Sequence, residues 1–183
     1  MSKNILIISG HPDLENNSLA NKTIIRELEE KMPQASIDVL SSLYPDYRFD
    51  VLREQEKLRQ ADVIVFQFPL FWYGIPSMLQ KWLEDVFLHG FSHGSSGTAL
   101  HGKKLIASVT TGAPEAAYQE ITIKELLKPL ELTARLTGLE YSGEIVTYGV
   151  SYTLRNDDEK RRDLLAKAAD HAERLTNLIN GIR

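Results

Sequence analysis

Val63-Ile64-Val65-Phe66-Gln67-Phe68 leads directly into Pro69-Leu70-Phe71-Trp72-Tyr73-Gly74-Ile75-Pro76. An apolar run of this length, rich in Val, Ile and Phe, predicts a buried strand, and the proline behind it predicts where the strand ends. The turn that follows carries three consecutive aromatic residues, although loops at strand ends normally lie on the surface. Either these aromatics pack onto the protein's own core, or they form part of a site for a flat apolar group.

This strand is one of five that alternate with helices along the chain. Continuous or alternating apolar residues predict strands over residues 3–9, 36–40, 63–68, 104–110 and 140–146. Apolar residues at helical spacing predict helices over residues 19–31, 51–60, 77–87, 121–137 and 157–180. Pro129 is expected to kink or split the fourth helix, and Gly138 to end it.

Strands that alternate with helices predict an α/β protein with a parallel sheet between two helical layers. The expected architecture is one doubly wound domain over residues 1–183, with strand order 2-1-3-4-5. Such sheets bind ligands at the carboxyl ends of the strands, where the strand order reverses. The loops expected to meet there are residues 10–21, 69–73 and 110–118.

Composition excludes several classes of partner and site. The chain has 183 residues, with 21 Lys and Arg against 25 Asp and Glu, and its formal net charge of -4 disfavours nucleic-acid binding. It has no cysteine, which excludes disulfides, thiolate metal sites and a cysteine nucleophile. No apolar run is long enough for a membrane span or a signal-peptide core, so a cytoplasmic location is expected.

The first loop has two interpretations. Ser18 precedes a helix, where it would act as an N-cap, but the same helix start could hold a phosphate with Ser18 and Asn21 as added donors. His11 would either donate to that anion or cap the strand end. Gly10-His11-Pro12 matches neither a Walker motif nor G-x-G-x-x-G, which disfavours nucleoside triphosphate and Rossmann dinucleotide sites.

Together the three loops suit a planar ring with polar edges and a phosphate tail. The second loop supplies aromatic faces and backbone amides, and the third supplies two hydroxyls and a glycine in Thr110-Thr111-Gly112. Flavin mononucleotide (FMN) has this chemistry, with its phosphate expected at the first helix and its ring beside Trp72. A flavin site gives the aromatic turn a reason to be apolar.

The sequence also resembles a known family over nearly its whole length. His11, Ser18-Leu19-Ala20-Asn21, residues 69–76 and Gly102-Lys103-Lys104 followed by Thr110-Thr111-Gly112 resemble the flavodoxin-like NAD(P)H:quinone oxidoreductases. Further segments look closest to the small ancillary flavoproteins of bacterial glutathione-gated potassium efflux systems. These segments are Leu43-Tyr44-Pro45-Asp46, Gln55-Glu56, Phe87-Leu88-His89-Gly90-Phe91 and residues 97–103.

The resemblance implies a flavodoxin-like fold and a homodimer with active sites near the subunit boundary. It implies that the flavin is bound by His11, Ser18, Leu19, Ala20, Asn21, Pro69, Leu70, Phe71, Trp72, Thr110, Thr111, Gly112 and Ala113. Tyr73 is expected to line the substrate floor. Relatives that bind flavin adenine dinucleotide (FAD) often have extra C-terminal structure, so FMN is favoured and FAD is the alternative.

The chain departs from the family pattern at two places. Where relatives usually have Thr-Thr-Gly-Gly, this chain has Ala113 in place of the second glycine, followed by Pro114, which reduces backbone freedom beside the flavin. Tyr118 stands where the family has its active-site tyrosine and is the predicted catalytic residue. The histidine that mammalian members place six residues later is Lys124 here, so a tyrosine–histidine pair cannot be carried over.

The expected activity is two-electron, ping-pong reduction of quinones or similar flat acceptors by NAD(P)H. Backbone amides of residues 71–73 and 111–113 would stabilise the reduced flavin. The alternative is a regulatory subunit that docks on a potassium efflux transporter at the membrane, with or without reductase activity. An electron-transfer flavodoxin is disfavoured, because that role suits a more acidic surface.

The glycine-rich loop over residues 89–102 has no predicted strand or helix. It is expected to be either a lid over the nicotinamide or quinone, or an ordinary surface loop. Its histidines, His89, His93 and His101, lack an acidic partner pattern, so no metal site is expected.

Overall fold

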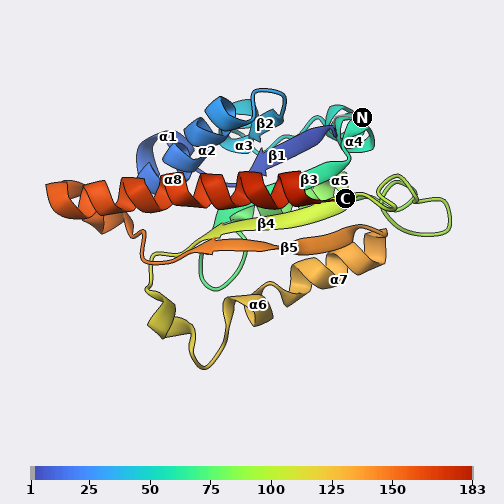
Figure 1. The fold of residues 1–183 in the computed structure, drawn as a ribbon. Helices are drawn as coiled ribbons and strands as arrows, with labels where there is room; N and C mark the ends of the chain where they lie inside the picture. The colour runs from blue at the N-terminus through green and yellow to red at the C-terminus, as the bar shows by residue number, and fades with distance from the viewer. Residues whose placement is uncertain (1–2, 183) are drawn as a thin grey trace.

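The computed structural model describes residues 3–182 and places five parallel strands in one sheet (Figure 1). Their order is β2-β1-β3-β4-β5, which confirms the predicted doubly wound arrangement. The strands lie within one or two residues of the predicted ranges. They are β1 (Ile5–Ser9), β2 (Ser36–Val39), β3 (Val63–Pro69), β4 (Lys104–Thr110) and β5 (Glu140–Thr147).

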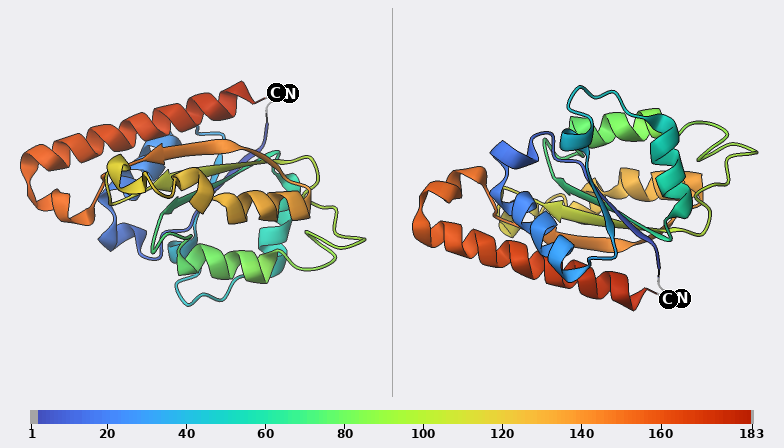
Figure 2. Two further views of the ribbon diagram at one scale, coloured as in Figure 1. Left: turned by 90° about the horizontal axis from the view of Figure 1, so that it is seen from below. Right: turned by 90° about the horizontal axis from the view of Figure 1, so that it is seen from above.

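Helices cover both faces of the sheet, as the two views of Figure 2 show. One face packs against α2 (Leu19–Lys31) and α8 (Asp158–Gly181). The other packs against α4 (Val51–Gln60), α5 (Ser77–Val86) and α7 (Lys128–Thr137). The predicted three-layer architecture is therefore confirmed.

Strand β3 lies at the centre of the sheet and contributes to both apolar cores. Val63 and Val65 pack in the cluster formed with α2 and α8, whereas Ile64 and Phe66 pack in the cluster on the opposite face. Successive side chains of a strand point to opposite faces, so a strand covered on both sides must be apolar at every position. This geometry explains the uninterrupted apolar run that opens the sequence pattern.

Short helical segments interrupt the predicted loops. They are α1 (Leu14–Asn17), α3 (Leu40–Leu43) and the 3₁₀ helices η1 (Glu115–Tyr118) and η2 (Tyr152–Asn156). Segments of four or five residues are too short to show helical periodicity, so the sequence pattern misses them.

The predicted helix over residues 121–137 is split into α6 (Ile123–Leu126) and α7. Pro129 lies in the first turn of α7, where a missing N–H costs no hydrogen bond. Gly138 ends α7 in a left-handed conformation with φ 71°, as predicted.

A buried histidine joins α8 to the sheet. Thr147 Oγ1 accepts from Arg174 at 2.7 Å and shares a hydrogen bond of 2.8 Å with His171 Nδ1. His171 Nε2 shares a hydrogen bond of 2.7 Å with Ser108 Oγ. These bonds join His171 to both β5 and β4. Burial, with a smaller effect of the Arg174 guanidinium, lowers the pKa of His171 to about 3.

The lowered pKa makes stability depend on pH. The unfolded chain binds a proton at His171 below about pH 6.5, whereas the folded chain resists that proton until about pH 3. The free energy of unfolding should therefore fall as the pH falls, by about 2 kcal/mol from this residue between pH 7 and pH 5. His171→Gln should show a correspondingly smaller loss between these pH values in urea titrations. Equal losses in both proteins would contradict this prediction.

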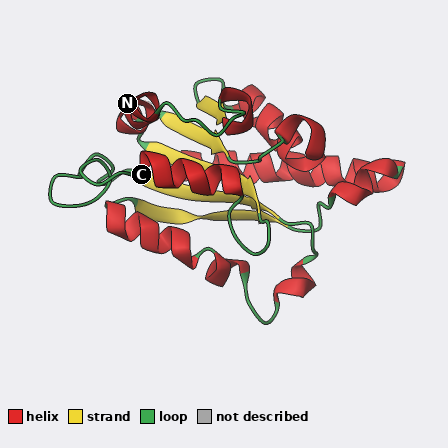
Figure 3. Cartoon of the chain, turned by 180° about the vertical axis from the view of Figure 1, so that it is seen from behind, coloured by secondary structure: helices red, strands yellow, loops and turns green. Residues whose placement is uncertain are grey.

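The glycine-rich loop over residues 89–102 joins the end of α5 to the start of β4. It therefore lies at the amino ends of the strands, where it projects from the end of the sheet opposite to η1 and η2 (Figures 1 and 3). None of its residues lines the cavity at the carboxyl ends described below. The loop does not cover that cavity, because it precedes its strand rather than following one. Its Ser92 and His93 line a second cavity, described below, so a lid over the nicotinamide or quinone stays a prediction.

Candidate functional site

The loops that follow β1, β3 and β4 meet at the carboxyl edge of the sheet and enclose a cavity of about 280 Å³. Every predicted cofactor-binding residue except Trp72 and Ala113 lines this cavity. Those that line it are His11, Ser18, Leu19, Ala20, Asn21, Pro69, Leu70, Phe71, Thr110, Thr111 and Gly112. The strand-order reversal therefore brings together segments that are about 100 residues apart in the sequence, as doubly wound sheets do.

Backbone contacts hold the three loops in place. Gly10 donates to the Gln67 carbonyl at 2.9 Å, and Leu70 donates to the Thr110 carbonyl at 2.8 Å. Gly10 also lies so close to α5 that an added Cβ would approach Leu79 Cβ to 2.6 Å. A glycine is required there because no larger residue fits between the loop and the helix.

Asn21 connects all three loops through its buried side chain. Its Oδ1 accepts from Gln67 Nε2 at 2.6 Å and from Thr110 Oγ1 at 3.0 Å. Its Nδ2 donates to Ser18 Oγ at 2.8 Å. Asn21 and Thr110 thus use their polar atoms to join α2, β3 and β4, which is a structural task in addition to lining the cavity.

The start of α2 offers donors that the fold leaves free. Ser18 is the N-cap, and its Oγ accepts from both the backbone N–H and Nδ2 of Asn21, which leaves its own proton available. Within residues 3–182, the N–H groups of Leu19 and Ala20 have no protein acceptor. These groups and the helix dipole are suited to binding a phosphate. The sequence left capping and phosphate binding as alternatives, and this geometry permits both at once.

His11 is buried beside this helix start and is neutral. Its Nδ1 accepts from the Asp13 N–H at 3.0 Å, so Nε2 carries the proton. The ring packs edge-on against Phe71, with 5.7 Å between centroids. Burial lowers the pKa of His11 to about 4, although the Asp13 carboxylate opposes the shift. His11 can therefore serve as a neutral N–H donor, but it brings no positive charge at neutral pH.

The aromatic turn is a tight two-residue hairpin. Phe71 and Gly74 exchange two backbone hydrogen bonds of 3.0 Å, and Trp72 and Tyr73 between them have φ values of 49° and 63°. These values correspond to the mirror-image turn that normally favours Asn-Gly. The Trp72 side chain is 97% exposed, so it does not pack on the core, which was one interpretation of this turn.

Two of the backbone N–H groups predicted to stabilise the flavin already donate hydrogen bonds within the protein. The Phe71 N–H is bound to Gly74, and the Thr111 N–H donates to the Thr147 carbonyl at 2.9 Å. In the described chain, the backbone N–H groups of Trp72, Tyr73, Gly112 and Ala113 have no protein acceptor. The amides available for a ring edge are therefore these four, so the predicted contributions of Phe71 and Thr111 are not available.

Tyr118 and Lys124 both lie away from the cavity. Tyr118 ends η1 and packs on Tyr148, with 5.8 Å between ring centroids. Lys124 lines a separate open cleft with Lys128 and Arg135. The catalytic role of Tyr118 stays a prediction, because its side chain does not line the cavity.

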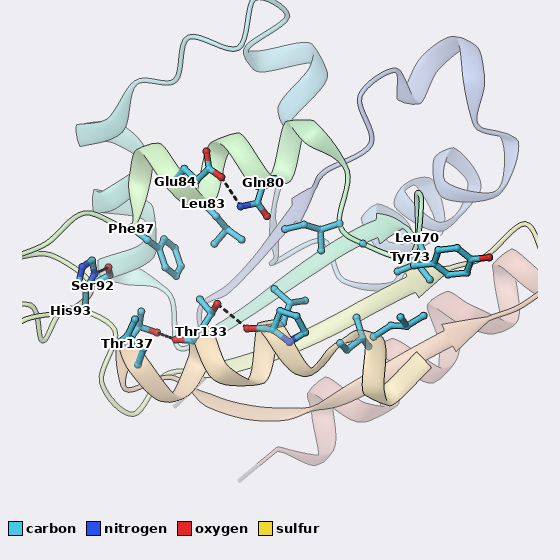
Figure 4. A pocket seen from close by; sticks show the side chains of 17 residues that line it. Leu70, Tyr73, Gln80, Leu83, Glu84, Phe87, Ser92, His93, Thr133 and Thr137 are labelled. Atoms are coloured by element: carbon cyan, nitrogen blue, oxygen red, sulfur yellow. Dashed lines mark hydrogen bonds between the residues drawn. The ribbon is translucent and has the colours of Figure 1, made fainter. Parts of the chain in front are cut away.

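A second, mostly apolar cavity of about 450 Å³ lies between α5 and α7 (Figure 4). We call it the α5–α7 groove; its apolar residues include Leu83, Phe87 and Leu130. Tyr73, the predicted substrate-lining residue, lies at one end and is 67% exposed. Leu70 lines both cavities, so the groove adjoins the carboxyl-end cavity at this residue.

Several cavity residues were missed by sequence reasoning. They are Asn17, Val150, Ser151, Tyr152 and Leu164. Most of them come from the segment after β5 and from α8, at the far side of the first loop. The segment after β5 carries no glycine-rich or aromatic run, and only the fold brings it to the site.

Two further searches of the described residues concern metals and membranes. In residues 3–182, no three His, Asp or Glu side chains are gathered as a metal site would require. None of the helices in this part of the chain has both the length and the apolar character needed to cross a bilayer.

Comparison with known proteins identifies relatives over most of the chain. General stress protein 14 of Bacillus subtilis is 41% identical over 158 residues, which are 84% of this chain and 89% of the relative. The uncharacterised NAD(P)H oxidoreductase YrkL of the same organism is 38% identical, over 83% and 89% of the two chains. The potassium-efflux ancillary protein KefG of an Enterobacter species is 36% identical, over 79% and 80%.

Solved structures of other proteins are also similar to this chain over most of its length. General stress protein 14 of Treponema denticola, in complex with FMN, superimposes with a TM-score of 0.84 at 28% identity and covers 96% of this chain and 99% of its own. An NADPH-quinone reductase of P. pentosaceus has a TM-score of 0.74 at 30% identity, with 92% and 97% covered. Residues 3–173 match the family described as having the flavodoxin-like fold. This chain belongs to that flavodoxin-like family.

Proposed function

We propose that this chain is an FMN-dependent oxidoreductase that uses NAD(P)H to reduce quinones or similar flat acceptors. The observation that carries the proposal is the cavity at the strand-order reversal, where free donors at the start of α2 face the same space as the aromatic turn and the Thr110–Gly112 segment. The relative from Treponema binds FMN, and others are an NAD(P)H oxidoreductase and an NADPH-quinone reductase, which supports the same assignment.

The donors around the cavity suit FMN. Ser18 and the amides of Leu19 and Ala20 would hold the phosphate, and the free amides of Gly112 and Ala113 would hold the oxygens of the ring edge. No Asp or Glu side chain lines the cavity, so no carboxylate opposes the phosphate. FAD remains the alternative cofactor.

FMN, when bound, supplies hydride acceptance from NAD(P)H and two-electron transfer to the acceptor. The residues of this chain bind it, orient it and stabilise negative charge at its edge through backbone N–H groups. Neutral His11 would donate its Nε2 proton on the same side as Ser18. Tyr73 and Leu70 would border the acceptor, because they line the groove that adjoins the cavity.

A direct test is to add FMN to purified protein and follow the oxidised flavin spectrum during anaerobic addition of NADPH or NADH. Bound flavin that either nicotinamide bleaches, and that a quinone reoxidises, is the expected result. Parallel double-reciprocal plots of the reaction rate would support the ping-pong order. Tyr118→Phe in the same assay tests the predicted catalytic role of the Tyr118 hydroxyl. Protein that binds no flavin would contradict the proposal.

The α5–α7 groove also supports the proposed homodimer. Leu136, which lines the groove, is 68% exposed, and Leu132 of the same helix, outside the groove, is 46% exposed. An apolar surface of this kind is costly in water unless a partner covers it. A second copy seated on α7 would close the groove next to Tyr73 and place each acceptor space at the subunit boundary.

Leu136→Glu is therefore expected to convert a dimer into a monomer without unfolding it, because a charge at this position opposes apolar contact between subunits. Light scattering after size-exclusion chromatography measures the change. Leu52→Glu is the matched control, since Leu52 on α4 is 80% exposed but lies outside the groove. A monomeric unmodified protein, or a dimeric Leu136→Glu, would contradict the assignment.

The second candidate function is that of an ancillary subunit of a potassium efflux transporter. It is favoured by the identity of 36% with KefG. Co-expression with such a transporter and affinity capture of the complex is the test. If this protein and the transporter do not associate, the regulatory function is wrong and the reductase function is unaffected.

A further inference from the structure

The residues that line the cavity offer a phosphate only neutral donors. Among residues 3–182, no Lys or Arg lines it, and His11 is neutral because burial lowers its pKa to about 4. The free groups at the start of α2 are neutral hydrogen-bond donors. A phosphate monoester carries nearly two negative charges at neutral pH, and an uncompensated charge in a cavity is costly.

The segment after β5 carries a cation that packs on one of the cavity's lining residues. Tyr152 lines the cavity from the start of η2 and is 42% exposed. The Arg155 guanidinium lies over its ring, with Cζ 3.2 Å from the centroid. Arg155 forms no ion pair with any residue in the described chain, so its charge is not neutralised by a carboxylate.

Stacking leaves the edge of the guanidinium free. An arginine that packs on an aromatic ring uses its planar face, whereas its N–H groups point outward in the plane and can bind an anion with two hydrogen bonds. The short η2 helix, capped by Ser151 Oγ accepting from the Thr153 N–H, sets Tyr152 and Arg155 on adjacent positions of one turn. The pair is therefore held together before any ligand arrives.

We propose that Arg155, seated on Tyr152, is the cation that binds the flavin phosphate and makes the site select FMN over riboflavin. The inference rests on the proposed flavin function and adds to it a specificity residue outside the three loops that the family pattern identifies. Tyr152, which lines the cavity, positions Arg155 beside it. The neutral donors of α2 and the Arg155 charge then act on the same phosphate.

The test is titration of the flavin-free protein with FMN and, separately, with riboflavin, followed by flavin fluorescence. Arg155→Ala should weaken FMN binding by about 10- to 100-fold, because charge-assisted hydrogen bonds contribute strongly, and should leave riboflavin binding nearly unchanged. The FMN affinity of Arg155→Lys should lie between those of the unmodified protein and Arg155→Ala, since lysine keeps the charge but lacks the planar guanidinium. Tyr152→Leu should weaken the binding of FMN more than the binding of riboflavin.

Arg135→Ala is the matched control. Arg135 is an exposed arginine of α7 that lines a different cleft, and its removal should leave both affinities unchanged. Raising the salt concentration should weaken FMN binding to the unmodified protein more than to Arg155→Ala. Circular dichroism checks that each variant is folded.

The outcomes separate this inference from the proposed function. If the unmodified protein binds neither flavin, the flavin function is wrong. If it binds FMN and Arg155→Ala binds FMN equally well, or loses FMN and riboflavin equally, the role of Arg155 is wrong while the flavin function stands. A changed preference between NADPH and NADH with unchanged FMN affinity would place Arg155 on the nicotinamide nucleotide and likewise overturn the proposal.

Discussion

Glu54→Ala should lower the free energy of unfolding by about 3–5 kcal/mol, which is a large part of the stability of a typical domain. Glu54 is fully buried on α4, where its carboxylate accepts from Tyr44 Oη at 2.9 Å, Trp82 Nε1 at 3.0 Å and Lys57 Nζ at 2.7 Å. Removal of the carboxylate leaves two buried donors without an acceptor and an ammonium with only Asp38 as its partner.

Urea titration followed by fluorescence measures this change, since Trp82 is itself buried in the core. Glu54→Gln should cost less, because an amide oxygen can still accept from Trp82. Glu56→Ala is the matched control: its carboxylate is exposed and accepts only from Gln60, at 2.9 Å. A loss below about 0.5 kcal/mol for Glu54→Ala would show that the network is not stabilising.

Asn21→Leu should disturb both the fold and the proposed cofactor site. The side chain of Asn21 is the common acceptor for Gln67 and Thr110 and the donor to Ser18, so an apolar side chain leaves buried polar groups unpaired on three loops. We expect a loss of about 2–4 kcal/mol in the free energy of unfolding. FMN affinity should fall by more than tenfold, because Ser18 and Thr110 lose their fixed positions.

Asn17→Leu is the comparison for this variant. Asn17 also lines the cavity, but it is exposed and its Nδ2 bonds only to Asp13. It should change stability by less than about 0.5 kcal/mol. Thermal unfolding with and without FMN separates the two effects. An Asn21→Leu protein with normal stability and FMN affinity would show that the three loops do not depend on the hydrogen bonds of Asn21.

The fold could be predicted from the sequence where periodicity is strong. The apolar run at residues 63–68 and the stripe along residues 157–180 are long enough to identify a strand and a helix. Their alternation along the chain indicated a doubly wound parallel sheet, and the flavodoxin-like order expected for five strands is the one observed. Gly138 and Pro129 behaved as expected, because their backbone preferences are local and do not depend on neighbours.

The candidate site could be predicted only in part, because several of its properties arise from tertiary contacts. No sequence pattern indicates that the Phe71 N–H is used within its own turn, or that Asn21 binds three loops. Tyr152 reaches the cavity because β5 ends beside β4, which is a property of the sheet and not of the segment. Composition likewise could not show that residues 89–102 lie at the amino ends of the strands, away from this cavity.

The hairpin at Trp72 and Tyr73 suggests a stability–activity trade-off. Both residues occupy a backbone region that costs large side chains about 1 kcal/mol or more, and a glycine would remove much of that cost. Two aromatic side chains in this conformation, one of them almost fully exposed, lower the stability of the free protein. A sequence such as Asn-Gly at residues 72–73 should therefore make the free protein more stable. The same change would remove Tyr73 from the border of the proposed acceptor space, together with its neighbour Trp72, so we expect the more stable protein to be the less active one.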